Sequence, residues 1–305
     1  FRNLGTCGVK VSPVCLGTAF RGVPDEATCL ATIDRALELG VNFVDCANAY
    51  GTGRSETLVG QALKGRRDRV VLTTKVCSPM GDGPNDGGLS RVHILREAEH
   101  SLRRLQTDYI DLYLAHTVDA ATPVEETVRA FDDLVRQGKA RYVGCSNFPA
   151  WRVAKGLWAS DRRNLATFAC VQDHYNLLDR RIERELVPLC RAEGLGIMTY
   201  SAVAVGLLTG AFRRGQTPPA GSLWARSPQR FEQVMTPAAD RVVQTLVDIA
   251  GQRGKTPAQV AVAWVISRPG VTAAIIGPDH PSQVDENLGG CGWQMEPAEL
   301  EALEQ

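Results

Sequence analysis

The chain has 305 residues, of which 44% are hydrophobic and 22% are charged. These proportions are typical of a globular protein and exclude a disordered chain or a collagen. Lysine and arginine together number 34, as do aspartate and glutamate, so the formal net charge is zero. Nucleic-acid-binding proteins usually carry a basic excess or a basic stripe, so this balance argues against a nucleic-acid partner.

The nine cysteines are scattered along the chain, and no two of them form a C-x-x-C pair. Such a set is not typical of a disulfide framework or a zinc site, and we predict no metal. It suits a reducing compartment, so we expect a cytoplasmic protein whose thiols are mostly small buried side chains. No apolar run approaches the ~20 residues that span a bilayer, and the first residues do not resemble a signal peptide.

Short apolar runs alternate along the chain with longer segments of helical period. A β-hairpin is expected first, over residues 5–12. The predicted strands are 14–17, 41–45, 70–75, 109–115, 140–145, 168–172, 196–200 and 273–277. The predicted helices are 25–39, 56–63, 91–105, 124–137, 151–159, 181–193, 239–251, 257–267, 283–288 and one that starts near 296. Residues 81–88 are rich in glycine, and residues 213–230 are rich in proline, glycine and arginine. Both segments are predicted to be loops.

Eight apolar strands separated by helices indicate a parallel sheet that is buried on both faces. Eight such units in about 300 residues favour an α/β fold of the (β/α)8 TIM barrel type, with the hairpin at its N-terminus and extra helices near its C-terminus. We expect residues 1–305 to form one domain. The alternative is an open doubly wound sheet, which would place a G-x-G-x-x-G turn after the first strand. Residues 17–22 (G-T-A-F-R-G) do not match that turn.

Polar residues stand at the ends of three neighbouring strands, where the active site of such a barrel lies. Asp45 ends the second strand, Lys75 the third and His116 the fourth, while Tyr50 follows five residues after Asp45. A lysine ammonium beside a phenol favours the phenolate, and a carboxylate holds that lysine in place. A histidine can orient a carbonyl. The four side chains together could therefore form a general acid that protonates a developing alkoxide.

Each of these residues also has a plainer interpretation. Lys75 could belong to a surface ion pair, Tyr50 could pack in its loop, and His116 could be a hydrogen-bonded core residue. Lys75 could also form a Schiff base in a lyase, although Asp45 argues against that, because such a lysine needs an apolar surrounding.

Several motifs in the same order resemble the aldo-keto reductase superfamily over nearly the whole chain. Residues 40–51 (GVNFVDCANAYG) resemble its G-x-x-x-x-D-T-A-x-x-Y-G signature, with Cys46 in place of threonine. Residues 144–148 (GCSNF) match G-x-S-N-F, and Gln172 with residues 175–178 (YNLL) matches Q-x-x-Y-N-L-L. Residues 200–201 (YS) and 206–210 (GLLTG) resemble the segment Y-S-P-L-x-x-G-L-L-T-G.

The resemblance implies a nicotinamide cofactor, NAD or NADP, and a small carbonyl or alcohol substrate. Tyr50 would donate the proton, Lys75 and Asp45 would tune it, and His116 would orient the carbonyl, with Phe20 lining the substrate pocket. The implied cofactor-binding residues are Gly17, Thr18, Asp45, Ser146, Asn147, Gln172, Tyr200, Ser201, Val203, Val205, Gly206, Gly277, Asp279, Gln283, Glu286 and Asn287. Ser146 and Asn147 could cap the next helix, either instead of binding the cofactor or in addition to it. Trp224 either reaches the pocket or lies on the surface of its loop.

Two departures from the family pattern slightly favour NAD over NADP. Ala211 stands where many relatives have lysine, and Asp279 follows the eighth strand where relatives carry a basic residue. A carboxylate repels the 2′-phosphate of NADP but accepts hydrogen bonds from a ribose 2′-hydroxyl. The arginines of residues 213–230, or a protonated His280, could still supply the missing charge. The chain is thus expected to be a sugar or alcohol dehydrogenase, with an NADPH-dependent aldehyde or ketone reductase and a non-catalytic regulatory subunit as alternatives.

Overall fold

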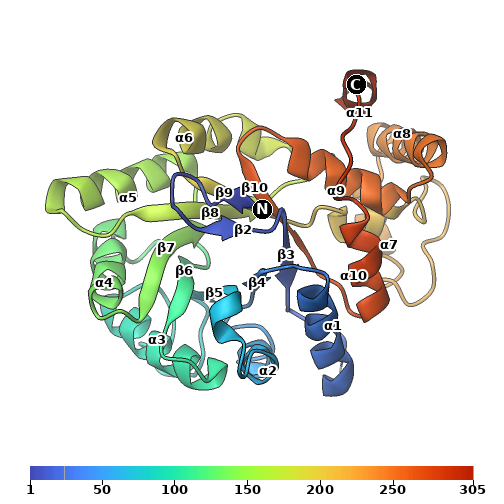
Figure 1. The fold of residues 1–305 in the computed structure, drawn as a ribbon. Coiled ribbons are helices and arrows are strands. Elements are labelled where there is room, and N and C mark those ends of the chain that lie inside the picture. The colour runs from blue at the N-terminus through green and yellow to red at the C-terminus, as the bar shows by residue number, and fades with distance from the viewer. Residues whose placement is uncertain (24, 305) are drawn as a thin grey trace.

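The computed structural model describes residues 1–23 and 25–304. In this part of the chain, eight parallel strands close into a barrel, as the sequence predicts (Figure 1). Going round the barrel, the strand order is β10, β3, β4, β5, β6, β7, β8 and β9. The strands are β3 (Val14–Gly17), β4 (Phe43–Asp45), β5 (Val71–Val76), β6 (Ile110–Ala115), β7 (Ala140–Ser146), β8 (Phe168–His174), β9 (Gly196–Tyr200) and β10 (Val271–Ile276).

Helices surround the barrel and cover its outer face (Figure 1). They are α1 (Glu26–Glu38), α2 (Arg54–Ala62), α3 (Arg91–Leu105), α4 (Val124–Arg136), α5 (Ala150–Arg163), α6 (Leu186–Glu193), α7 (Pro228–Val234), α8 (Pro237–Arg253), α9 (Pro257–Ser267), α10 (Pro281–Leu288) and α11 (Pro297–Glu304), with 3-10 turns η1 (Arg67–Arg69), η2 (Arg181–Glu183) and η3 (Ala204–Thr209). Side-chain caps stabilise the first turns of several helices. Asp25 accepts hydrogen bonds from the backbone of α1, and Thr256 forms a capping box with Gln259.

The N-terminal hairpin covers the end of the barrel at which the strands begin. It pairs β1 (Arg2–Asn3) with β2 (Lys10–Val11), slightly wider than the predicted 5–12. Leu4 and Val11 are buried against side chains of the barrel interior, among them Phe43 and Met198. Figure 1 shows the hairpin lying across the strands. The barrel is therefore filled and closed at this end.

Helices α2 and α3 pack in close contact because of one glycine. A Cβ atom at Gly60 of α2 would lie 2.7 Å from the backbone oxygens of Arg104 and Leu105, near the end of α3. Only a residue without a side chain allows the two backbones to approach this closely. Gly251, on the exposed face of α8, meets nothing within 4 Å.

The structure corrects three details of the prediction. The helix expected over 181–193 begins instead as the 3-10 turn η2, and α6 starts only at Leu186. Residues 228–234 form α7, although the predicted loop ran to residue 230. Ser146 and Asn147 do not cap α5, because Ser146 ends β7 and Pro149 occupies the cap position without a side-chain hydrogen bond.

Candidate active site

The four predicted catalytic residues come together at the carboxyl ends of β4, β5 and β6. Asp45 is the last residue of β4, and Lys75 is the last but one of β5. His116 directly follows β6, and its backbone N–H donates to Val76. Tyr50 lies in the tight turns that leave β4, where its N–H donates to Ala47 and its carbonyl accepts from Ser55. Parallel strands end at the same rim, so these side chains share one place.

Lys75 lies at the centre of this group and is fully buried. Its Nζ donates to Asp45 Oδ2 at 2.7 Å, to the Cys46 carbonyl at 2.8 Å and to Tyr50 Oη at 3.3 Å. Burial alone would lower the pKa of Lys75, but the Asp45 carboxylate and the nearby Tyr50 outweigh it and raise that pKa. Lys75 therefore stays an ammonium that points one proton at the phenol oxygen.

His116 lies beside Tyr50, with the two rings edge to face and 5.6 Å between their centroids. Burial, with the charges of Lys75 and Arg21, lowers the pKa of His116 to about 3. The imidazole is therefore neutral at physiological pH. Within the described residues, neither of its ring nitrogens has a hydrogen-bond partner, and Nδ1 is fully buried. A neutral imidazole of this kind can hydrogen-bond a substrate oxygen without placing a second positive charge beside Lys75.

A cavity of about 450 Å³ opens above these residues. It is bounded by the ends of β3, β4, β7, β8, β9 and β10 and by the loops that leave them. The predicted residues that line it are Gly17, Phe20, Asp45, Tyr50, His116, Ser146, Asn147, Gln172, Tyr200, Ser201, Val203, Val205, Gly277, Asp279 and Asn287.

Four residues of the predicted cofactor set lie outside the cavity wall. Thr18 is fully buried below it, where its hydroxyl bonds to the Asp45 carbonyl and the Ser55 hydroxyl. Gly206 belongs to η3, behind Val205. Gln283 and Glu286 are exposed on α10, although the Gln283 side chain accepts a hydrogen bond from the Asp279 N–H at 2.7 Å.

Amide side chains connect the catalytic group to the opposite wall of the cavity. Gln172 Nε2 donates to Asp45 Oδ1 at 2.9 Å, so both oxygens of that carboxylate are held. Tyr200 Oη donates to Asn147 Oδ1 at 2.8 Å, and Asn147 Nδ2 donates to the His116 carbonyl at 3.0 Å. Asn147 has a φ of +58°, a left-handed conformation that aims its side chain across the cavity.

The segment that follows β9 has an unusual backbone. Ser201, Ala204 and Val205 all have positive φ angles, which non-glycine residues rarely adopt. Among the described residues, the N–H groups of Ala202, Val203 and Val205 donate no hydrogen bond, and all three residues line the cavity. The Trp224 Nε1 donates to the Val205 carbonyl at 3.0 Å and is buried, so Trp224 supports this segment from behind. Neighbouring free N–H groups of this kind can form an anion-binding concavity.

Comparison with known proteins identifies the family. The family model described as the Aldo/keto reductase family matches residues 13–305. The chain belongs to the aldo/keto reductase family. It is 39% identical to the uncharacterized oxidoreductase YrpG of Bacillus subtilis, over 94% of this chain and 90% of that protein. It is 36% identical to a probable voltage-gated potassium channel subunit beta of Arabidopsis thaliana, over 94% and 90% of the two chains. It is 33% identical to the versiconal hemiacetal acetate reductase of Aspergillus parasiticus, over 100% and 96%.

This aldo/keto reductase family member also has cavity residues that sequence reasoning missed. Ala19, Arg21, Val262, Ile275 and Ile276 line the cavity. Ile275 and Ile276 belong to β10, Val262 to α9 and Ala19 to the loop after β3, and none of the four stands in a motif. Arg21 stands four residues after the first strand, and a basic residue so close to a strand end was the signal that could have found it.

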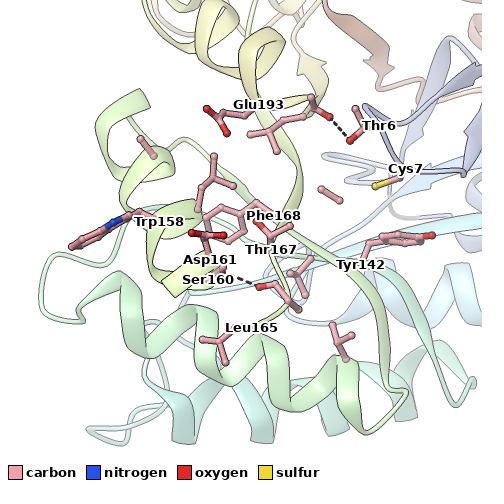
Figure 2. Close-up of a pocket in the computed structure, with 18 of the residues that line it drawn as sticks. Thr6, Cys7, Tyr142, Trp158, Ser160, Asp161, Leu165, Thr167, Phe168 and Glu193 are labelled. Atoms are coloured by element: carbon pink, nitrogen blue, oxygen red, sulfur yellow. Dashed lines mark hydrogen bonds between the residues drawn. The ribbon is translucent and has the colours of Figure 1, made fainter. Parts of the chain in front are cut away.

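A second, larger cavity of about 800 Å³ lies at the other end of the barrel. Figure 2 shows it between the hairpin, the start of β8 and the end of α5, with Cys7, Phe168 and Trp158 among its lining residues. None of the predicted catalytic residues lines it. No group of three histidine, cysteine or acidic residues in the described part of the chain is arranged to hold a metal. Nor is any described helix long and apolar enough to cross a membrane.

Proposed function

We propose that the protein interconverts a carbonyl and an alcohol with a nicotinamide cofactor, with Tyr50 as the general acid and base. The observation that carries this proposal is the position of Lys75, whose ammonium contacts both Asp45 and Tyr50 beneath the cavity. The pair holds a positive charge against the phenol oxygen and stabilises the phenolate that remains after Tyr50 gives up its proton.

A bound nicotinamide would supply the hydride to the carbonyl carbon in the reducing direction. The Tyr50 hydroxyl would then give its proton to the carbonyl oxygen, and His116 would hydrogen-bond that oxygen and orient it. In the oxidising direction the Tyr50 phenolate would take the proton of the alcohol. Hydride and proton together account for the two hydrogens gained or lost by the substrate.

The cavity fits such a cofactor in two places. The free N–H groups of Ala202, Val203 and Val205 suit a pyrophosphate, since backbone donors of this kind bind phosphate oxygens well. The side chains of Ser146, Asn147 and Gln172 lie together at the cavity wall and suit the carboxamide of the nicotinamide ring. Tyr200, beside them, would stack on that ring.

We further propose that NAD is preferred over NADP, which favours the dehydrogenase direction, because cells keep NAD mostly oxidised. Asp279 supports this preference, because it lines the cavity and pairs with no cation among residues 1–23 and 25–304. Burial raises the pKa of Asp279, and His280 only partly opposes that effect. Arg213 is engaged elsewhere, with Asp240 at 2.9 Å. The nine free thiols suit a reducing compartment, so the proposal includes a cytoplasmic location.

Lyase chemistry at Lys75 is disfavoured. A Schiff-base nucleophile must be a neutral amine, whereas the Asp45 carboxylate raises the pKa of Lys75 and keeps it protonated.

The test combines binding and turnover. The purified protein is titrated with NADH and with NADPH while its tryptophan fluorescence is recorded, and Trp224, bonded to the cavity segment, is expected to report. Aldehyde reduction and sugar oxidation are then measured for the wild type, Tyr50→Phe and the control Tyr142→Phe, which changes a tyrosine in the cavity at the other end of the barrel.

Tyr50→Phe is expected to bind the cofactor normally and to lose turnover by about 10²–10⁴-fold, the usual contribution of a general acid. Tyr142→Phe is expected to retain full turnover. Undiminished turnover in Tyr50→Phe would overturn the assignment of Tyr50. Cofactor binding with no turnover of any substrate would favour a non-catalytic subunit instead, and no cofactor binding would contradict the whole proposal.

A further inference from the structure

Arg21 lies in the loop that leaves β3 and lines the active-site cavity. The residue before it, Phe20, is buried and has a φ of +43°. This rare left-handed turn at a bulky residue holds the aromatic ring inward and brings the next residue to the cavity rim. Arg21 itself is exposed. It thus combines a backbone position at the rim with a side chain that is free to meet a ligand.

The guanidinium of Arg21 is not used within the protein. No described residue forms an ion pair or a side-chain hydrogen bond with it, whereas the arginines at positions 35, 66, 67, 91, 96, 104, 136 and 213 are all paired with acids. The other cationic side chain at this site is that of Lys75, which Asp45 neutralises, and His116 is uncharged. Among the described residues, Arg21 is therefore the one uncompensated positive charge of the cavity wall.

Arg21 leaves β3, whose last residue, Gly17, pairs with Asp45 at the end of β4, and it lines the same cavity as Phe20 and Tyr50. After burial and Lys75, Arg21 is the third cause that lowers the pKa of His116. At Asp279, where the adenosine end of a cofactor is expected, the charged neighbour that acts on the carboxyl is His280 instead. Arg21 is thus better placed to meet a group on the substrate than the far phosphate of a cofactor.

We propose that Arg21 binds an anionic group of the substrate, a carboxylate or a phosphate ester, while the carbonyl of the same molecule lies against Tyr50 and His116. The planar guanidinium fork matches both kinds of oxyanion and can bind either with two hydrogen bonds. This inference rests on the proposed function and names its substrate class. Binding of the anionic group at the mouth of the cavity would also fix which end of the substrate faces Tyr50.

The test uses two matched pairs of carbonyl compounds with the intact protein and its preferred cofactor. One pair is 4-carboxybenzaldehyde and 4-methylbenzaldehyde, and the other is glyceraldehyde 3-phosphate and glyceraldehyde. The variants are Arg21→Met, Arg21→Lys and the control Arg69→Met. Arg69 is exposed and has no side-chain partner among the described residues, and it precedes β5 at the opposite end of the barrel, so the control removes the same charge.

The wild type is expected to prefer an anionic member over its neutral partner. Arg21→Met is expected to lower kcat/KM for that member by about 10- to 100-fold, the range for one hydrogen bond to a charged group, through KM rather than kcat. The neutral partner should change less than about twofold, Arg21→Lys should be intermediate, and Arg69→Met should match the wild type. Added salt should raise KM for the anion in the wild type but not in Arg21→Met. The pair of compounds whose kcat/KM depends on Arg21 shows whether the anionic group is a carboxylate or a phosphate.

Three results would overturn the inference while leaving the proposed function intact. They are turnover of neutral substrates with no anionic preference, an equal loss for both members of a pair in Arg21→Met, and weaker fluorescence-detected NADH or NADPH binding in that variant, which would assign Arg21 to the cofactor. If the wild type turned over no compound of either pair or any sugar, the proposed function itself would fail, and the assignment of Arg21 with it.

Discussion

The carboxylate of Asp45 is held from both sides in the candidate active site. Lys75 binds one of its oxygens and Gln172 the other, and all three side chains are buried. Burying such an ion pair costs desolvation energy that its own attraction often fails to repay, so pairs of this kind are weak contributors to stability. A role in orienting the Lys75 ammonium toward Tyr50 accounts for the arrangement better than stability does.

Replacement of His116 is expected to flatten the dependence of stability on pH. The folded-state pKa of His116 is about 3, against 6.5 ordinarily, so the unfolded chain binds a proton between these values that the folded chain does not. Stability is therefore lost as pH falls from about 6.5 to about 3. His116→Gln should lose less stability than the wild type between pH 7 and pH 4.5 in urea denaturation. The exposed His280→Gln should behave like the wild type, and parallel losses in all three proteins would contradict the prediction.

A second prediction concerns the choice of cofactor. Asp279→Ser combined with Ala211→Lys is expected to raise the NADP/NAD ratio of kcat/KM by at least about tenfold, since one charge-assisted hydrogen bond contributes about 1.5–3 kcal/mol. Steady-state kinetics with both cofactors measures this ratio. Glu193→Ser, which removes an exposed carboxylate at the far end of the barrel, is the matched control. An unchanged ratio in the double variant would show that Asp279 does not discriminate.

The residues that sequence could identify are those that stand in spaced motifs at strand ends. Asp45, Tyr50, Lys75 and His116 meet in the structure because parallel strands end at one rim. Arg21 belongs to no motif, and its value depends on what surrounds it, namely that no described residue forms an ion pair or a side-chain hydrogen bond with it although it lines the cavity. That property arises only when the chain is folded.

At the scale of elements, the alternation of apolar runs and helical periods was sufficient to predict the barrel, because each strand and each helix has its own pattern of buried residues. The region between β9 and α8 was harder. Its composition indicates a loop, yet the structure contains α7 and buries Trp224 against Phe231 of that helix. Trp224 also donates to the Val205 carbonyl, and Phe231 contacts Phe212. Local sequence patterns do not report contacts of this kind, because they join residues outside one local segment.

The packing of α2 on α3 leads to a prediction about stability. Gly60→Ala is expected to lower the free energy of unfolding by about 1–3 kcal/mol, because its Cβ would overlap the backbone at the end of α3. Gly251→Ala is the matched control and is expected to raise it by about 0.5–1 kcal/mol, since the site is open and alanine favours a helix. Chemical denaturation measures both. A destabilisation of equal size in the two variants would contradict the packing argument.

The molecule as a whole has two chemically different ends. The predicted catalytic residues, Arg21 and Asp279 occupy one end, while the hairpin, its buried Leu4 and Val11, and the larger cavity occupy the other. The closed end supports the barrel from below, and the open end carries the proposed chemistry. Mutations at the two ends can therefore serve as controls for one another, as Tyr142, Arg69 and Glu193 do above.

The distribution of thiols follows the same division. Seven of the nine cysteines are buried, and only Cys7 and Cys291 are partly accessible. Cys7 lines the cavity beside the hairpin, and Cys291 lies near Arg2 and Pro13. Both positions are on the side away from Tyr50. Titration of the native protein with a thiol reagent is expected to modify at most these two, and slowly at neutral pH, because burial raises the pKa of both thiols.

Coupling to an electrode or a bead through either thiol would consequently attach the protein by the side away from Tyr50. The mouth of the barrel would face the solution, where cofactor and substrate arrive by diffusion. The protein is thus suited to oriented attachment without the addition of any engineered cysteine.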